Sequence, residues 1–396
     1  MANCECQRYC GHIWAAAENC RMKRTVRKIS RSGYQKLAKP LLFRQHPDKA
    51  HENMIKTARL LHQMRGENIL RVWNYKNPRL EQELLGLKFK NPLGMSAGLD
   101  KNFDLPPIAK RIGLGFEIGG STTAQVCAGN PRPWFRRLPS EKSIVVNVGL
   151  ANNGITRNIE RIQKYPRRLW HDFPLSVSVA KTNNLENASD REAIADYCDS
   201  LRQLERAGYA PLYEINISCP NTYGGEPFTT PARLEKLLNA IDDLHLTRPI
   251  FIKMPTDKKW LDFAKLLEVA DRHKVAGLTI GNLIKDRLAL QNPKVLGDNI
   301  EGNLSGKPAQ KITTDLIYKT YGKYRSRFII IGVGGVFTAE DAYEKIRAGA
   351  SLVAMVTALM FEGPQVVGEI NEGLVKLLDR DGFQNITEAV GSAHRR

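Results

Sequence analysis

The stretch FIIIGVGGVFTAEDAYEKIRAGASLVAMV, residues 328–356, contains two apolar runs separated by a segment of helix length. The runs Phe328–Ile331 and Leu352–Val356 are short and rich in branched apolar residues, as is typical of strands buried on both faces. Between them, the glycine-rich turn 332–335 is followed by Ala339–Ala348, which is long enough for a helix. A strand, a helix and a strand in this order predict a parallel β-α-β unit.

The same alternation recurs along the chain from about Leu84 onward. Further apolar runs occur at Leu93–Met95, Phe116–Ile118, Ile144–Val146, Leu175–Val179, Tyr213–Ile217, Ile250–Ile252 and Gly277–Ile280. Helix-length segments lie between most of them, at Arg191–Ala207, Ala232–Leu244, Trp260–His273 and Lys311–Tyr321. About eight repeats within about 300 residues favour a closed barrel over an open doubly wound sheet. We therefore predict an α/β fold: a (β/α)8 TIM barrel with a small N-terminal helical segment.

Composition and charge exclude several classes of protein. The chain has 396 residues, of which 42% are hydrophobic and 25% charged, so wholesale disorder is excluded. No stretch approaches the roughly 18 apolar residues that a membrane-spanning helix needs. The net charge is +18, yet the first 60 residues alone carry 13 basic and 4 acidic side chains. A nucleic-acid binder should spread basic groups over a folded face, so this concentration indicates a basic appendage and no nucleic-acid partner.

The N-terminal region divides into two parts. Residues 34–74 show apolar residues at helical spacing, which predicts two short amphipathic helices that either pack on the main domain or lie in a membrane interface. The stretch 21–39 is rich in Arg, Lys and Ser without an acidic residue, which suits a transit peptide or a basic membrane-facing arm equally. We expect a poorly ordered basic extension at 1–33, a helical segment at 34–76 and the barrel at 77–396.

Four of the seven cysteines crowd the first twenty residues, at Cys4, Cys6, Cys10 and Cys20. Their spacing is reminiscent of metal ligands, but no second C-x2-C knuckle follows, so we expect no metal centre. An apolar segment with a small-residue cleavage site is also missing from the start of the sequence. Secretion and a disulfide framework are therefore not expected.

Polar and small residues follow the strands where a TIM barrel carries its chemistry, at the carboxyl ends. Two lysines, three asparagines and one thiol do so, at Lys101, Lys253, Asn216, Asn221, Asn282 and Cys219. Amide side chains both donate and accept hydrogen bonds, which suits a flat, polar heterocyclic substrate. Glycine-rich turns after the last strands commonly bind phosphate, and Gly334 and Gly335 stand in such a turn. A phosphate-binding turn beside a binding site for a flat ring suggests flavin mononucleotide (FMN).

Six motifs resemble those of the dihydroorotate dehydrogenases. They are Leu87-Lys88-Phe89-Lys90-Asn91-Pro92, Ala97-Gly98-Leu99-Asp100-Lys101-Asn102, Gly129-Asn130-Pro131-Arg132-Pro133, Asn216-Ile217-Ser218-Cys219-Pro220-Asn221-Thr222, Leu304-Ser305-Gly306-Lys307-Pro308 and Ile331-Gly332-Val333-Gly334-Gly335. The run Asp341–Ala350 adds to the resemblance, which spans about residues 34–396. Residues 34–74 resemble the N-terminal helix pair that forms the quinone tunnel of the membrane-associated, quinone-reducing class 2 enzymes.

The resemblance implies that dihydroorotate passes a hydride from C6 to flavin N5 while a base, Cys219, removes a proton from C5. It implies that the pyrimidine is bound by Lys101, Asn147, Asn216, Asn221, Thr222 and Asn282. It also implies that FMN is bound by Ala97, Gly98, Lys101, Ser121, Ser178, Asn216, Lys253, Gly281, Ser305, Gly306, Gly334, Gly335, Val356 and Thr357. Lys253 would stabilise negative charge on the reduced ring. Arg137 would face the quinone path.

The sequence departs from the class 2 pattern at several of these positions. Class 2 members usually carry serine where Cys219 stands, whereas the soluble class 1 enzymes use cysteine. A thiol, with an ordinary pKa of about 8.5, is a better base near neutrality than a hydroxyl. A flavin-facing asparagine of the family is Ser178 here, and the threonines that flank Asn282 are Gly281 and Leu283. Val356 replaces a tyrosine, and Asn147 stands one position later than the family's asparagine.

The leading hypothesis is therefore quinone-linked oxidation of dihydroorotate to orotate in pyrimidine biosynthesis. The enzyme would bind peripherally to a bacterial cytoplasmic or mitochondrial inner membrane. The alternative is a soluble FMN oxidoreductase of the same barrel family that uses fumarate or NAD as acceptor, or acts on another pyrimidine. Fold alone does not separate the two, because function resides in the site.

Overall fold

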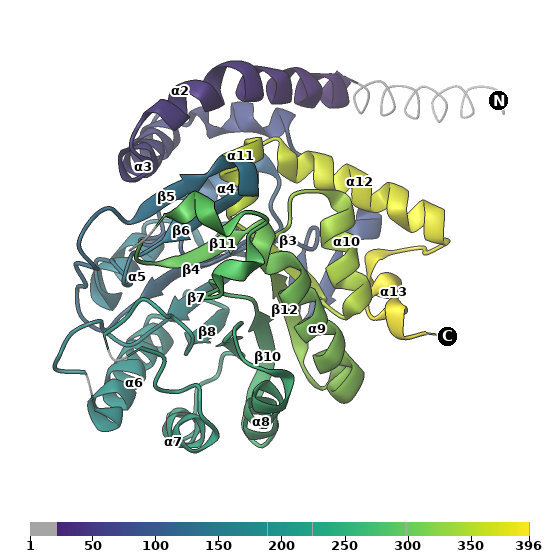
Figure 1. The fold of residues 1–396 in the computed structure, drawn as a ribbon. Coiled ribbons are helices and arrows are strands. Elements are labelled where there is room, and N and C mark those ends of the chain that lie inside the picture. The colour runs from purple at the N-terminus through teal and green to yellow at the C-terminus, as the bar shows by residue number, and fades with distance from the viewer. Residues whose placement is uncertain (1–21, 188, 224, 298–299, 396) are drawn as a thin grey trace.

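The computed structural model describes residues 22–187, 189–223, 225–297 and 300–395. Eight parallel strands close into a barrel surrounded by helices, which confirms the predicted TIM barrel (Figure 1). In chain order the strands are β3 (Leu93–Met95), β4 (Phe116–Thr122), β7 (Leu175–Val179), β8 (Leu212–Asn216), β9 (Ile250–Met254), β10 (Val275–Ile280), β12 (Ile329–Val333) and β13 (Leu352–Met355). Parallel pairing of β13 with β3 closes the ring and brings the carboxyl ends of all these strands to one rim.

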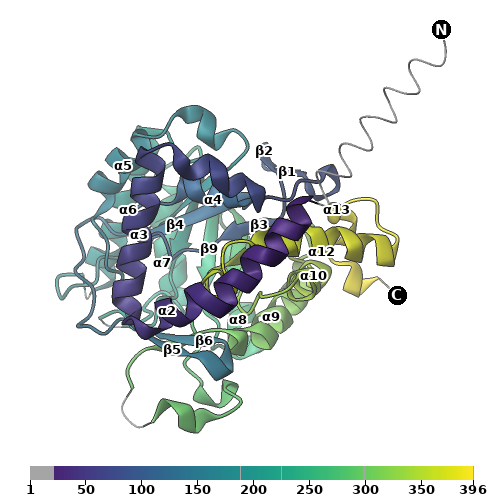
Figure 2. The same cartoon turned by 90° about the horizontal axis from the view of Figure 1, so that it is seen from above.

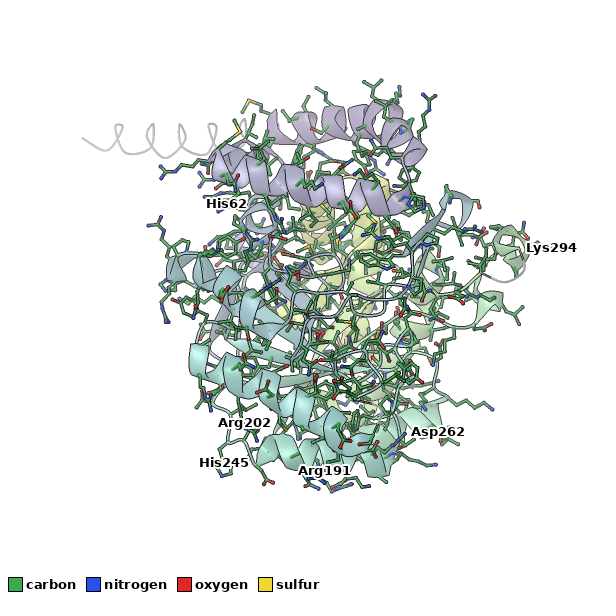
Figure 3. The ribbon with its side chains drawn as sticks, turned by 90° about the vertical axis from the view of Figure 1, so that its left-hand side faces the viewer. His62, Arg191, Arg202, His245, Asp262 and Lys294 are labelled. Atoms are coloured by element: carbon green, nitrogen blue, oxygen red, sulfur yellow. The ribbon has the colours of Figure 1, made fainter. Side chains whose placement is uncertain are left out.

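The outer helices are α4 (Pro106–Ile112), α5 (Ile155–Gln163), α6 (Asp190–Ala207), α7 (Pro231–Asp242), α8 (Trp260–Asp271), α9 (Gln310–Tyr324), α10 (Ala339–Ala348), α11 (Thr357–Glu362), α12 (Val366–Asp381) and α13 (Ile386–Ala389). The helices α6 to α10 follow the predicted segments closely, whereas the others were not predicted. Local sequence sets their ends: Thr338 and Asp341 form a capping box at the start of α10. Charged side chains of α6 and α8, such as Arg191, Arg202 and Asp262, lie at the periphery (Figure 3).

Apolar side chains fill the barrel interior below the rim. Phe116, Leu212, Phe251 and Ile331, from four different strands, belong to one buried cluster. Phe89 joins this cluster from a short antiparallel hairpin formed by β1 (Gln82–Leu84) and β2 (Leu87–Phe89). The barrel is therefore a packed core, and open space occurs only toward the rim.

One predicted barrel strand lies elsewhere. The run Ile144–Val146 belongs to β6 (Ser143–Val146), which pairs with β5 (Phe135–Leu138) and β11 (Asn303–Gly306) in an antiparallel sheet outside the barrel. A short apolar run does not reveal which partner strand it will pair with, so this assignment was wrong. The small sheet lies over the rim, where it contributes residues to the site described below.

The N-terminal helices form a layer against one side of the barrel (Figures 1 and 2). Residues 22–33 are helical and run without a break into η1 (Tyr34–Ala38) and α2 (Lys39–Arg44). After a turn, α3 (Pro47–Gln63) runs back and ends in η2 (Gly66–Val72), which confirms a helix pair. Residues 22–33, which we expected to belong to a poorly ordered extension, are therefore described by the structure as part of this helical layer.

Ion pairs explain why residues 22–33 are ordered. Arg27, only 1% exposed, pairs with Glu372 on α12, and Arg24 reaches the same carboxylate at 3.0 Å. One turn later, Arg31 contacts Glu369 at 3.0 Å. Part of the basic charge of this region therefore serves to dock the first helix on α12. The four cysteines of residues 1–21 lie outside the described residues.

Within the described ranges, no helix is long and apolar enough to cross a membrane. This agrees with the hydropathy of the sequence. The exposed faces of α2, α3 and η2 nevertheless carry large apolar side chains, namely Leu41, Met54, Leu60 and Ile69.

Replacing Glu372 by Gln should destabilise the protein, because Arg27 then remains buried without a counter-charge. We expect the free energy of unfolding to fall by about 3 kcal/mol, the usual cost of breaking a buried ion pair. Urea denaturation measures this change. Lys376→Gln is the matched control, because it removes an exposed partner of the same carboxylate and should cost less than about 1 kcal/mol. Equal losses in both variants would contradict the docking role of Arg27.

Candidate active site

A cavity opens at the carboxyl ends of the barrel strands, below the small antiparallel sheet. Its empty space, the open mouth included, is about 890 Å³. Twelve of the predicted site residues line it: Ala97, Gly98, Lys101, Ser121, Asn216, Cys219, Asn221, Lys253, Asn282, Ser305, Val356 and Thr357. They come from the ends of separate strands, as the topology of a TIM barrel requires.

A second cavity adjoins the first and extends toward the glycine-rich turn after β12. Gly281, Gly306, Gly334 and Gly335 line it, and so do seven residues that also line the first cavity. The two cavities are therefore parts of one elongated site. Its far end is lined by Ala309, next to the start of α9, and by Thr357 and Ala358 of α11. Backbone N–H groups at a helix start favour an anionic group.

Two glycines show how closely a bound ligand could approach the backbone. A Cβ atom on Gly98, whose φ is +112°, would point into open space within the first cavity. A Cβ on Gly335, whose φ is +71°, would lie 2.5 Å from the Cβ of Gln310. The first glycine thus leaves room for a flat guest, and the second permits the tight turn beside α9.

Hydroxyl and amide groups form the floor of the first cavity. The amide of Asn216 donates to the hydroxyl of Ser121 at 2.8 Å, and the same hydroxyl lies 2.8 Å from that of Ser178. On the opposite side, the hydroxyls of Ser305 and Thr357 lie 2.8 Å apart. These bonds fix the side chains before any ligand binds.

Two lysines bring positive charge into the site. Lys253 is 6% exposed and lines both cavities, and among the described residues no group accepts a hydrogen bond from its Nζ. Burial lowers the pKa of Lys101 to about 8, against the opposing effect of Asp100 and Asp48. A buried ammonium without a carboxylate at contact distance is suited to an anionic or electron-rich guest.

His51 on α3 also lines the first cavity, and sequence reasoning missed it. The Nζ of Lys101 donates to its Nε2 at 3.3 Å, and its ring lies edge-on to Phe135. Burial and the charges of Lys101 and Arg132 lower the pKa of His51 to about 3, so the imidazole is neutral. No periodicity marks this histidine, because it reaches the site from a helix more than forty residues before the barrel lysine.

Cys219 lies on the loop after β8, at the junction of the first cavity and a smaller one. Burial raises the pKa of its thiol to about 11, although Lys253 and a hydrogen bond from the backbone of Asn221 favour the thiolate. The free site therefore holds the protonated thiol at neutral pH. Proton abstraction by this sulfur therefore requires the thiolate, whose fraction grows as the pH approaches the pKa of Cys219.

Asn221 and Asn282 line the cavity but already have protein partners. Asn221 donates to the carbonyl of Val146 at 2.8 Å, and its own oxygen accepts from Asn303. The amide nitrogen of Asn282 donates to the hydroxyl of Ser218 at 2.8 Å. Both residues thus brace the loops around the cavity as well as lining it.

Four predicted residues do not line the two main cavities. Val146, at the end of β6, faces the first cavity, so Asn147 faces away, since side chains alternate along a strand. Its amide donates to Glu301 at 3.2 Å and accepts from Asn130 at 2.8 Å. Asn147 thus lies outside both cavities and binds neighbouring side chains, and its contact with substrate stays a prediction.

The other three support neighbouring groups. Ser178 lies beneath Ser121 as a fully buried partner. The hydroxyl of Thr222 donates to the carbonyls of Cys219 and Gly225, so it stabilises the loop and borders only the smaller cavity. Arg137 donates to the carbonyl of Gln45 at 2.8 Å and covers the ring of Phe43, which holds the end of α2.

The structure also reveals an apolar wall, of which only Val356 was a predicted site residue. Phe135, Ile144, Val146, Leu150, Val356 and Met360 line the first cavity. Three of these residues lie on the antiparallel sheet and one on α11, so only the tertiary fold assembles them. In the described part of the chain, no group of His, Cys, Asp and Glu could hold a metal ion.

Comparison with known proteins gives consistent matches. A family model described as dihydroorotate dehydrogenase matches residues 79–378. The chain is 32% identical to the dihydroorotate dehydrogenase (quinone) of Crocosphaera subtropica, covering 87% of this chain and 94% of that protein. It is 34% identical to that of Haloarcula marismortui, covering 90% and 98%. A crystal structure of DHODH from Eimeria tenella in complex with ferulenol superposes with a TM-score of 0.79 at 25% identity, covering 89% and 96%.

Lys101→Met should raise the pKa of His51 above about 3, because one nearby positive charge is removed. Burial remains the larger cause, so the value should stay below the ordinary 6.5. NMR titration of the histidine ring protons measures it. Lys56→Met, on the exposed face of α3, is the control and should leave the His51 titration unchanged. An unchanged titration in Lys101→Met would refute the contact between the two side chains.

Proposed function

The chain belongs to the dihydroorotate dehydrogenase family, and we propose that it oxidises dihydroorotate to orotate in pyrimidine biosynthesis and passes the electrons to a membrane quinone. One observation carries the proposal most directly. Cys219, Asn216 and Lys253 converge on one cavity that continues into a glycine-lined anion site. A base, amide donors and acceptors, and room for a flat phosphorylated cofactor therefore adjoin each other.

The residues present fit FMN. The open space over Gly98 would admit a flat ring, and the turn at Gly334 and Gly335 would receive a phosphate. When bound, FMN supplies a hydride acceptor. The residues that would hold it are Ala97, Gly98, Lys101, Ser121, Asn216, Lys253, Gly281, Ser305, Gly306, Gly334, Gly335, Val356 and Thr357. Lys253 would place its positive charge beside the part of the ring that becomes electron-rich.

The remaining polar groups would act on the pyrimidine. Lys101 and the amides of Asn216, Asn221 and Asn282 would orient its carbonyl, N–H and carboxylate groups. The thiolate of Cys219 would take the proton from C5: an S–H bond forms as the C5–H bond breaks. The electron pair left on C5 then becomes the second bond to C6, from which the hydride departs. Base and hydride acceptor would thus lie on either side of one bound ring.

The quinone would approach from the N-terminal layer. His51, Phe135 and Met360 form the part of the first cavity nearest α2 and α3, and its surface is mostly apolar. Arg137 would border this path through its contacts with Phe43 and Gln45. Exposed apolar side chains on α2, α3 and η2, among them Leu41 and Ile69, would rest in the membrane surface beside basic groups. Residues 34–76 would then act as a membrane and quinone segment, joined to the barrel of residues 77–396.

The test is anaerobic mixing of the purified full chain with dihydroorotate, followed by a choice of acceptors. The protein should be yellow, dihydroorotate should bleach the flavin absorption, and a quinone should restore it faster than fumarate or NAD. Restoration by fumarate or NAD alone would favour the soluble alternative. A colourless protein, or one that dihydroorotate does not bleach, would refute the proposal.

Cys219→Ser should slow flavin reduction by about 10²–10⁴-fold, the usual contribution of a general base. In the wild type the rate should rise with pH toward about 11, because the thiolate fraction grows tenfold per pH unit below the pKa of Cys219. Stopped-flow absorption at a series of pH values between roughly 6 and 10 measures both effects. Identical rates and profiles in the two proteins would remove Cys219 from the role of base.

Met360→Trp should fill the apolar end of the cavity and slow reoxidation by quinone. Reduction by dihydroorotate should change little, because the polar half of the site is untouched. Separate measurement of the two half-reactions distinguishes these effects. Met54→Trp, on the exposed face of α3, is the matched control. Equal loss of both half-reactions in Met360→Trp would show that this end of the cavity is not the quinone path.

A further inference from the structure

We propose that Lys181 is a positioning residue that holds the Cys219 loop and stabilises the thiolate with its positive charge. The proposal rests on the function proposed above, in which Cys219 is the base. Lys181 lies two residues after the end of β7, and Cys219 lies three residues after the end of β8. Because β7 and β8 are parallel neighbours, both residues emerge side by side at the rim.

Contacts place Lys181 against the loop. Its Nζ donates to the carbonyl of Tyr223 at 3.0 Å, four residues beyond Cys219. Lys181, Cys219, Thr222 and Tyr197 line the same small cavity next to the main one. Lys253, which lies on β9, lines the main cavity with Cys219 but does not line this smaller one.

Lys181 is a buried ammonium whose pKa is lowered by burial and raised by the nearby carboxylate of Asp196 and by Cys219. Its side chain is 4% exposed, and within the described ranges no carboxylate lies at ion-pair distance from its Nζ. The nearby carboxylate of Asp196 accepts hydrogen bonds from the backbone N–H and hydroxyl of Thr182 instead. Burying an ammonium without a direct ion pair is costly, so the thiolate form of Cys219, which accepts the proton, is the natural counter-charge.

The other titratable groups around the thiol are few. Lys253 favours the thiolate, whereas Glu226 and Cys127 disfavour it, and burial has the largest effect. Burial lowers the pKa of Lys181, while Asp196 and Cys219 raise it. The hydroxyl of Tyr197 is directed to the carbonyl of Asn216 and remains protonated, since burial raises its pKa. Among these titratable groups, Lys181 and Lys253 are therefore the two whose positive charge could stabilise the thiolate.

Three substitutions separate charge from anchoring. Lys181→Gln keeps an N–H donor for the Tyr223 carbonyl but removes the charge, Lys181→Met removes both, and Lys181→Arg keeps both. Lys265→Met is the control, because Lys265 is an exposed lysine of α8 that pairs with Asp262 and lines neither cavity that Cys219 lines. Thermal unfolding of each full-length variant establishes that it is folded.

The first readout is alkylation of Cys219 by iodoacetamide as a function of pH, followed by peptide mass spectrometry. It requires neither dihydroorotate nor turnover, so it tests the inference even if the proposed function fails. In the Gln and Met variants the pH needed for a given alkylation rate should rise by about one unit, which corresponds to tenfold less thiolate. The Arg variant and Lys265→Met should match the wild type.

The second readout is the pH profile of flavin reduction by dihydroorotate. Lys181→Gln should shift this profile to higher pH and lower the rate about tenfold at neutral pH, with little change in KM. Normal alkylation and a normal profile in Lys181→Gln would overturn the electrostatic role, and a defect in Lys181→Met alone would show that the lysine only anchors the loop. If alkylation shifts as expected but dihydroorotate reduces no flavin in any variant, the proposed function fails while the contact between Lys181 and Cys219 stands.

Discussion

The site depends on the closure of eight parallel strands by backbone hydrogen bonds. Register between neighbouring strands places Asn216 level with Lys253, and Lys253 level with Thr279. Every residue that follows a strand therefore reaches the same rim, whatever its distance along the chain. A slip of one residue in any of these pairings would turn the amide or the lysine out of the barrel. The strand register must therefore be correct before these side chains can act together in one site.

The barrel and most of its rim could be predicted because each relevant residue directly follows its own strand. Asn216, Cys219, Lys253 and Gly334 need only the topology to be brought together. Residues supplied by other elements could not be found in this way. His51 arrives from a helix, and the orientation of Asn147 depends on an antiparallel sheet whose partner strands are far apart in sequence.

The sequence predicted where the basic charge is concentrated, but it did not predict which groups the basic side chains contact. The basic excess at the N-terminus includes Arg27 and Arg31, which fold residues 22–33 onto acidic groups of α11 and α12. The rim of the barrel collects a different set of cations, Lys101, Lys181 and Lys253. Of these, Lys253 favours the thiolate of Cys219, whose burial favours the neutral form, and Lys181 is proposed to do the same. Burial and these cations act in opposite directions on the sulfur. Their balance decides whether it can accept a proton from a bound ligand.

The most direct test is a crystal structure of the full chain grown with orotate. The account predicts a flavin ring across the rim between Gly98 and Lys253, with its phosphate at Gly334 and Gly335. It also predicts the sulfur of Cys219 in van der Waals contact, at about 3.5–4 Å, with C5 of orotate on the face opposite the flavin. A sulfur turned away from the ligand, or a rim that holds no flavin, would contradict it.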